Sequence, residues 1–188
     1  MPRYFIGKKS TVEDCRSVSV GAMAREGIFR WGPGYRASWR WSVTEEGEQK
    51  EVASMGLATV GHEGVVTGVV FAYTITRYNG EKVPCRYEVR IDRTPCHFGG
   101  WRYWFVCPLV VGGRPCHQRV AKLYLPPGGT YYGCRHCYNL TYESVQRHDK
   151  RVDALMKLPW EALEDLADRA GMSQRMLALQ TMMKRLRR

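Results

Sequence analysis

The stretch VVTGVVFAYTITRYNGEKVPCRYEVRI, residues 65–91, predicts the fold of the N-terminal half of the chain. Residues 65–78 are rich in β-branched and aromatic side chains, which favour strands. Asn79-Gly80 is a tight hairpin signal, and residues 83–91 alternate apolar with charged side chains. This pattern predicts two antiparallel strands with one packed face and one wet face.

Neighbouring segments extend the same pattern on the N-terminal side. Residues 37–43 alternate Trp and Val with polar residues, and residues 52–60 form a further predicted strand after a turn at 45–48. Upstream, residues 19–25 predict a short helix that Ser19 caps and Gly27 ends. We therefore expect an antiparallel β meander that follows a short helix.

Beyond residue 91 the elements become shorter. A loop at residues 94–100 marks a predicted domain boundary, and short strands are expected at 101–106, 120–125 and 130–133. After Cys137 the composition changes to helix formers with a 3.6-residue apolar period, which predicts a helical tail.

The 188 residues include 29 Lys and Arg against 18 Asp and Glu, a formal net charge of +11. Five basic residues and no acidic one lie between residues 96 and 137. Such an excess favours a polyanionic partner, DNA or RNA, although a basic surface also occurs on proteins that bind neither. No stretch approaches the ~18 apolar residues of a membrane helix, and residues 1–9 do not resemble a secretory signal. We expect a cytoplasmic protein without membrane contact.

Seven cysteines are an odd number, so disulfides cannot pair them all. In a cytosolic chain, clustered cysteines are more often metal ligands. Cys15 and Cys85 show no partner spacing and are predicted to be core residues. The other five lie between residues 96 and 137, where the basic residues also gather.

Cys107, Cys116, Cys134 and Cys137 are the predicted metal ligands. Two residues separate the last pair, which lets both thiolates face one ion, and seventeen residues separate Cys116 from Cys134, as in four-cysteine zinc sites. The first pair has eight intervening residues, but Gly112-Gly113 lets this insert loop out. A closed four-thiolate zinc site stabilises a small module and performs no chemistry.

Other arrangements of these residues stay open. One thiol pair with the remaining cysteines in the core would need no metal. Cys96 or His97 could replace one ligand of the zinc site. His117 is next to Cys116, and His136 lies between Cys134 and Cys137. Because adjacent residues rarely bind the same ion, neither histidine is expected to coordinate the metal.

Aromatic and basic residues surround the cysteines. In a strand, Trp101, Tyr103 and Phe105 share one face, and one of the two faces should be core. Aromatic rings among cations can stack on unpaired bases while the cations bind phosphates, or the rings can simply pack the strands together. The candidate nucleic-acid-binding residues here are Arg102, Trp104, Arg114, Arg119, Lys122 and Arg135.

The tail predicts two helices, residues 159–170 and a second helix capped by Ser173. The second has an apolar stripe of Met176, Leu179, Met183 and Leu186. The spacing of apolar and small residues also matches a helix-turn-helix, at Leu166, Ala167, Ala170, Gly171, Met172 and Leu177. In that motif Gln174 and Arg175 would face the major groove of DNA, and Lys184 and Arg185 would contact phosphates. The alternative is a plain hairpin that docks or oligomerises through the Met-rich stripe.

These observations predict an α+β protein with an antiparallel β-rich body (residues 1–95), a zinc ribbon (96–140) and a C-terminal helical hairpin (141–188). TPCHFGGW (94–101), WFVCP (104–108), VAKLYLPPGG (120–129) and CRHCYNLTY (134–142) resemble a family of uncharacterised bacterial zinc-ribbon proteins found in phage and mobile-element settings. TVEDC (11–15) and WRW (39–41) are similar to its N-terminal part. The resemblance implies zinc on the same four cysteines and no particular activity.

The sequence contains neither a Gly-rich phosphate loop nor paired acidic residues near the basic cluster, so it offers no motif that indicates an enzyme. The leading hypothesis is a zinc-stabilised nucleic-acid-binding protein with a regulatory, non-catalytic role. The alternative is a phage or mobile-element protein-interaction factor that binds a host enzyme or defence complex. Enzymatic activity ranks third.

Overall fold

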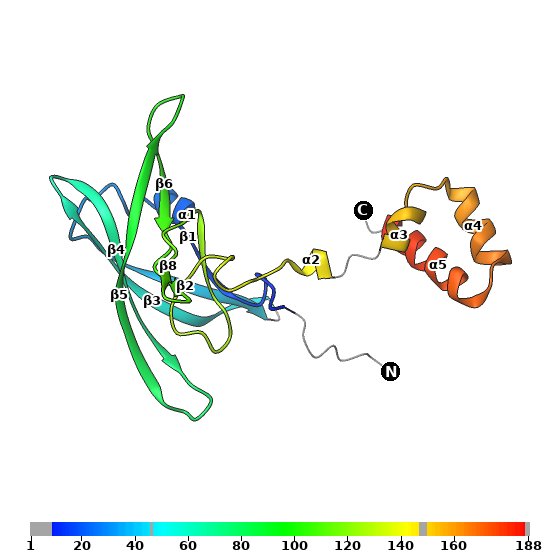
Figure 1. The fold of residues 1–188 in the computed structure, drawn as a ribbon, viewed down its shortest axis with the longest axis horizontal. Coiled ribbons are helices and arrows are strands. Elements are labelled where there is room, and N and C mark those ends of the chain that lie inside the picture. The colour runs from blue at the N-terminus through cyan, green and yellow to red at the C-terminus, as the bar shows by residue number, and fades with distance from the viewer. Residues whose placement is uncertain (1–8, 46, 147–149, 187–188) are drawn as a thin grey trace. The chain divides into compact units, whose positions relative to one another are not determined.

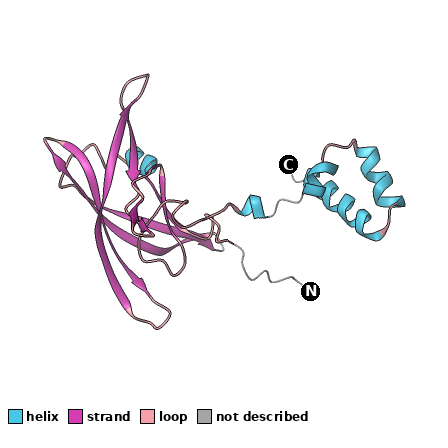
Figure 2. Ribbon diagram, viewed as in Figure 1, coloured by secondary structure: helices cyan, strands magenta, loops and turns pink. Residues whose placement is uncertain are grey.

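The computed structural model describes residues 9–45, 47–146 and 150–186. The chain divides into two compact units, Met1–Tyr142 and Glu143–Arg188. The first consists mainly of strands and the second of helices (Figure 1, Figure 2). This confirms the α+β class, with an antiparallel sheet body and C-terminal helices.

A curled antiparallel sheet forms the body of the first unit (Figure 1). Five of its six strands follow one another in both sequence and space, so the predicted meander is confirmed. In spatial order the strands are β2 (Arg36–Glu45), β3 (Glu48–His62), β4 (Val65–Thr76), β5 (Lys82–Pro95), β6 (Trp101–Val106) and β9 (Arg119–Val120).

The turn between β4 and β5 is longer than Asn79-Gly80 suggested. The last pair of the ladder is Thr76 with Lys82, so five residues, 77–81, form the loop. The Asn79 side-chain oxygen accepts the Glu81 N–H at 3.1 Å, and Gly80 has a φ of 81°. The amide of Asn79 therefore stabilises a wider turn than the two-residue type.

The predicted boundary at residues 95–96 joins two strands of one sheet. β5 continues to Pro95, which pairs with Trp101 of β6. Across this pair the Arg93 guanidinium lies 4.2 Å from the centre of the Trp101 ring, and Trp104 Nε1 donates to Thr94 Oγ1 at 3.1 Å. These contacts extend the ladder past Ile91, and the ribbon segment belongs to the same compact unit as the body.

Residues 120–125, expected as one strand, form two. β9 pairs with β6, whereas β10 (Lys122–Leu125) pairs with β1 (Arg16–Ser19). The chain changes partner at Ala121, whose carbonyl accepts the Val20 N–H at 3.0 Å. The strand expected at 130–133 is limited to a bridge between Tyr124 and Gly133.

The core lies between the sheet and the β1–β10 pair with helix α1 (Val20–Arg25). As predicted, Ser19 caps α1, since its side chain accepts the Ala22 N–H. Phe71 is at the centre and meets Phe105 and Tyr132 edge to face. These contacts bury the apolar faces of the sheet and of the β1–β10 pair in a single core.

The described residues of the second unit form four helices: α2 (Glu143–Gln146), α3 (Lys150–Leu155), α4 (Trp160–Arg169) and α5 (Met172–Leu186). The helix predicted from Pro159 is confirmed, with Pro159 at its N-cap. The next helix begins one residue before Ser173, because the Gly171 carbonyl accepts the Arg175 N–H at 3.0 Å.

Candidate metal centre and ribbon pocket

The side chains of Cys107, Cys116, Cys134 and Cys137 meet, with all four Sγ atoms within 4.8 Å of one another. Two of the Sγ–Sγ distances, Cys107 to Cys137 and Cys116 to Cys134, are 3.8 Å. A tetrahedral ion with bonds of about 2.3 Å to sulfur separates its ligands by about 3.8 Å. The four thiols can therefore hold one metal ion.

Short elements bring the two halves of the centre together. Cys107 follows β6, and the eight-residue insert folds into a hairpin of β7 (Val110–Val111) and β8 (Arg114–Pro115). At its base the Cys116 N–H donates to the Leu109 carbonyl at 2.9 Å. The long spacing between the first two cysteines is thus absorbed by a side hairpin, as expected from Gly112-Gly113.

Backbone N–H groups point at the sulfur atoms. The Cys134 N–H donates to Cys107 Sγ at 3.3 Å, and the Cys137 N–H donates to Cys134 Sγ at 3.4 Å. The amides of Leu109 and Gln118 interact in the same way with Cys107 and Cys116. Hydrogen bonds to a charged acceptor favour its ionised form, so these amides favour thiolates.

Burial opposes ionisation at three of the four thiols, those of Cys107, Cys116 and Cys137. It raises the pKa of Cys107 to about 11 and also raises the pKa of Cys137. Burial also opposes ionisation of Cys116, but hydrogen bonds from the Gln118 amide and the neighbouring thiols lower the pKa of Cys116 from its usual value. A bound cation would offset the burial and let all four act as thiolates.

The alternative ligands lie elsewhere. Cys96 and His97 belong to an exposed loop, and His117 and His136 are exposed beside the centre. In the part of the chain that the structure describes, the four cysteines are the only group of three or more His, Cys, Asp or Glu side chains close enough to hold one metal ion. Cys85 is buried as predicted, whereas Cys15 is half-buried and its thiol lies 3.2 Å from the Thr11 carbonyl.

A shallow pocket of about 320 Å³ lies beside the metal centre, and we call it the ribbon pocket. It gathers four of the six ribbon residues expected to bind nucleic acid. Its lining is Trp104, Arg119, Val120, Ala121, Lys122, Tyr124, Arg135, His136 and Tyr142. Sequence reasoning missed both tyrosines, which lie outside the two aromatic runs beside the first and third cysteines.

Cations and rings are paired at the ribbon pocket. The Arg135 guanidinium lies 5.2 Å from the centre of the Tyr142 ring, and that of Arg102 lies 4.3 Å from the centre of the Trp104 ring. Arg102 and Trp104 occupy the outer face of β6, while Tyr103 and Phe105 face the core. The expectation that one face of this strand is core is therefore confirmed.

No acidic residue lines the ribbon pocket. Arg119 forms an ion pair with Asp92 of 3.4 Å, in which both side chains are about half exposed. Exposed pairs of this kind contribute about 1 kcal/mol or less, so Arg119 can exchange this partner for a phosphate. Arg114 lies on β8 and is not part of the lining.

The residues expected to read DNA from the tail have different surroundings. Gln174 and Arg175 are exposed in the first turn of α5. The Arg185 guanidinium donates to three carbonyl oxygens at and just after the end of α3, those of Leu155, Met156 and Leu158. Arg185 thus ties α5 to α3, and the Lys184 side chain lies outside the described residues.

The helix-turn-helix pattern is not reproduced at Met172. That pattern needs an apolar side chain inside the unit, and Met172 is 85% exposed. Ala167 is buried as the pattern expects. Met172 is the first residue of α5 and is not covered by neighbouring side chains. At Met172 the sequence therefore matches the spacing of a helix-turn-helix without the burial that the motif needs.

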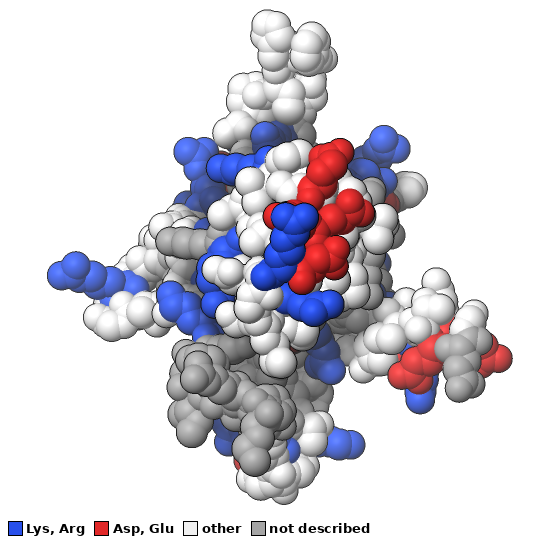
Figure 3. Space-filling view, turned by 90° about the vertical axis from the view of Figure 1, so that its right-hand side faces the viewer, with Lys and Arg blue, Asp and Glu red and all other residues white. Residues whose placement is uncertain are grey.

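On the face seen in Figure 3, Lys and Arg lie among neutral residues and beside a group of Asp and Glu. The net charge of +11 therefore does not locate a binding site there. In the ribbon pocket, cations and aromatic rings lie in one lining.

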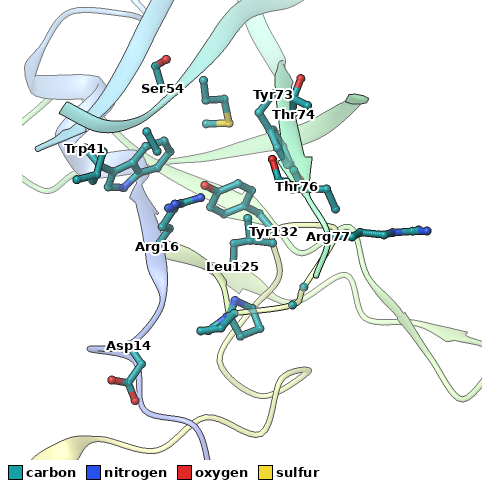
Figure 4. A pocket seen from close by; sticks show the side chains of 18 of the residues that line it. Asp14, Arg16, Trp41, Ser54, Tyr73, Thr74, Thr76, Arg77, Leu125 and Tyr132 are labelled. Carbon is teal, nitrogen blue, oxygen red and sulfur yellow. The ribbon is translucent and has the colours of Figure 1, made fainter. Parts of the chain in front are cut away.

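A larger cavity of about 930 Å³ opens between β2, β3, β4 and the loop after β10 (Figure 4). Arg16 reaches from β1 toward Trp41 and Tyr132 in this cavity (Figure 4). Trp41 is held by a hydrogen bond of 3.0 Å from its Nε1 to the Ser17 carbonyl. No pattern in the sequence indicates this cavity, because its aromatic residues match the alternation of ordinary half-buried strands.

Comparisons with protein-family models, with curated proteins and with solved structures found no match to this chain. The resemblance to zinc-ribbon proteins accordingly stays a prediction. Among the described residues, no helix has both the length and the apolar character needed to cross a membrane.

Proposed function

We propose that this protein binds single-stranded nucleic acid at the ribbon pocket, next to a zinc ion held by the four cysteines. The observation that carries the proposal is the convergence of Trp104, Lys122 and Arg135 in one acid-free pocket beside the metal centre. The resemblance to zinc-ribbon proteins agrees with the metal but says nothing of the ligand.

Zinc is the metal that best suits the ligand set. Four sulfur ligands in a tetrahedral arrangement favour Zn²⁺ or iron, and closed four-cysteine sites are typical of structural zinc. Four protein ligands fill the tetrahedral coordination of a zinc ion, which leaves no open position for water or substrate. In this proposal the role of the ion is to hold the ribbon.

Single strands fit the pocket better than a duplex. Bases in a duplex are stacked on each other, whereas an unpaired base can stack on Trp104 or Tyr142. Lys122 and Arg135 lie in the same lining and can take the flanking phosphates. The pocket has no long helix to enter a major groove, which favours stacking over groove recognition.

The test is a salt titration of binding to fluorescently labelled single-stranded DNA and RNA. We expect the logarithm of affinity to fall linearly with the logarithm of salt concentration. Lys122→Ala should reduce the slope by about 1, and Trp104→Ala should cost about 1–3 kcal/mol of binding free energy.

Lys82→Ala is the matched control, because Lys82 is an exposed cation at the start of β5 that lines neither cavity. It should leave affinity within about twofold of the unmodified chain, as expected for a distant surface charge. The proposal fails if no binding occurs at low salt, or if Lys82→Ala and Lys122→Ala weaken binding equally.

A further inference from the structure

Helix α5 exposes an apolar stripe along its whole length. The exposed fractions of its side chains run from 42% to 85%. The stripe residues are Met172, Met176, Leu179, Met183 and Leu186. Their spacing of four, three, four and three residues is that of the a and d positions of a heptad.

The opposite side of α5 makes the contacts within the helical unit. Ala178 and Thr181 are fully buried, and α5 packs against α3 and α4. Hydrogen bonds from Arg185 to the end of α3 fix the rotation of the helix further. The stripe therefore points outward while small residues provide the internal packing, and the unit does not use the stripe for its own core.

The width of the stripe indicates what covers it. Two positions in seven form the narrow seam by which one helix packs against another, whereas helices that lie on membranes present a wider apolar face. A partner helix with the same heptad spacing would place its apolar side chains between those of α5.

Charge selects among partner helices. The sequence of α5 contains Arg175, Lys184 and Arg185 and no acidic residue. Arg175 is exposed and flanks the stripe beside Met176 and Leu179. Arg185 is engaged by the end of α3, so Arg175 is the cation that the described side chains present beside the stripe. A second α5 would bring another Arg175 and no acidic residue to the seam, whereas Glu at a flanking position of a partner would be attracted to Arg175.

We infer that the α5 stripe docks an acidic amphipathic helix of a partner protein. The inference is independent of the nucleic-acid proposal, because it uses a different unit of the chain and no residue of the ribbon pocket. An apolar seam provides the contact area, and the basic flank provides the preference for an acidic partner.

The probe is a labelled synthetic helix of three heptads with Leu at a and d and Glu at e and g, titrated with the full chain by fluorescence anisotropy. We expect saturable binding. Leu179→Asp should weaken it at least about tenfold, because a charge in the seam loses its hydration on docking. Gln174→Asp is the control, since it adds the same charge at an exposed position of α5 outside the stripe.

Leu179 and Met176 are both exposed, so their substitution should leave the circular dichroism spectrum unchanged. If Leu179→Asp alters the spectrum, Met176→Asp serves as the test variant. Several outcomes would overturn the inference: no saturable binding, equal binding of a peptide with Lys at e and g, or equal losses with Gln174→Asp. Dimerisation, or binding to phosphatidylserine vesicles, that Leu179→Asp abolishes would assign the stripe to a second copy or to a membrane instead.

Discussion

Cys134 takes part in the metal centre with both its side chain and its backbone. Its Sγ lies 3.8 Å from that of Cys116 and accepts the Cys137 N–H. Its own N–H donates to Cys107 Sγ, and its side chain is fully buried. One residue thus contacts the other three cysteines, and its loss should affect the whole centre.

Cys134→Ser should therefore abolish binding of about one metal ion per chain. Serine is a poor ligand for zinc at neutral pH, and structural zinc contributes on the order of 10 kcal/mol in small metal-dependent modules. Elemental analysis of the purified protein and thermal unfolding measure both effects. Cys96→Ser is the control, since Cys96 is exposed and outside the cluster. Metal retained by Cys134→Ser, or lost equally from Cys96→Ser, would contradict the assignment.

At the scale of elements, a bulge between Val60 and Gly61 lets β3 follow the curl of the sheet. A Cβ atom at Gly61 would lie 1.9 Å from the Val65 carbonyl oxygen, an overlap with backbone that no side-chain rotation relieves. At Gly56 in the same strand the nearest atom would be 3.5 Å away, an ordinary contact. The two glycines share one strand but differ in the space that surrounds them.

Gly61→Ala should consequently destabilise the fold by about 3 kcal/mol, as overpacking against fixed atoms does. Gly56→Ala should change the free energy of unfolding by no more than about 0.5 kcal/mol. Urea unfolding of the two variants under identical conditions separates them. Equal effects would mean that glycine is needed in β3 for reasons other than the bulge.

The elements that the sequence predicts well are those with a strict local pattern. Alternation marks the strands of the meander, and the Cys-x-x-Cys spacing with its partner cysteines marks the metal centre. Both depend on neighbours along the chain, so a single sequence reveals them. Gly112-Gly113 predicts that the insert between Cys107 and Cys116 loops out, although not that it pairs as β7 and β8.

Other features depend on contacts between distant segments. The change of partner at Ala121 follows from pairing with β1, more than a hundred residues away. Tyr142 joins the ribbon pocket because the chain passes Arg135 after the metal turn. A Cβ at Gly133 would lie 2.0 Å from the Leu109 side chain, which would have to shift to make room. No local pattern encodes such tertiary contacts, so the sequence could not predict them.

At the scale of the whole first unit, three tyrosines join the sheet to the segment before Cys134. The Tyr73 and Tyr87 hydroxyl groups lie 3.2 Å apart, and the Tyr132 N–H donates to the Tyr87 hydroxyl at 2.8 Å. Burial raises the pKa of Tyr87 to about 12 and raises the pKa of Tyr73 and Tyr132 as well. These hydroxyl groups resist ionisation in the folded protein.

A raised pKa in the folded state means that folding favours the protonated phenol. Its contribution is complete below pH 10, the usual pKa of tyrosine, and is lost as the pH rises through about 12. We expect the free energy of unfolding in urea to fall steeply between pH 10 and 12. Tyr87→Phe should be less stable at pH 7 by about 1–3 kcal/mol, because it leaves the Tyr132 N–H unpaired, and should show a shallower fall. Stability that is constant across this range would contradict the role of the tyrosines.

The two units of the molecule should differ in their response to metal removal, because all four ligands lie in Met1–Tyr142 and the sequence from Glu143 to Arg188 has no cysteine. A chelator should therefore lower the melting temperature of the β-rich unit and leave that of the helical unit unchanged. In calorimetry we expect two unfolding transitions, of which the chelator shifts only one to lower temperature. Circular dichroism at 222 nm identifies the helical transition. Readdition of zinc should restore the first transition, whereas a chelator that shifts both equally would show that the units unfold as one.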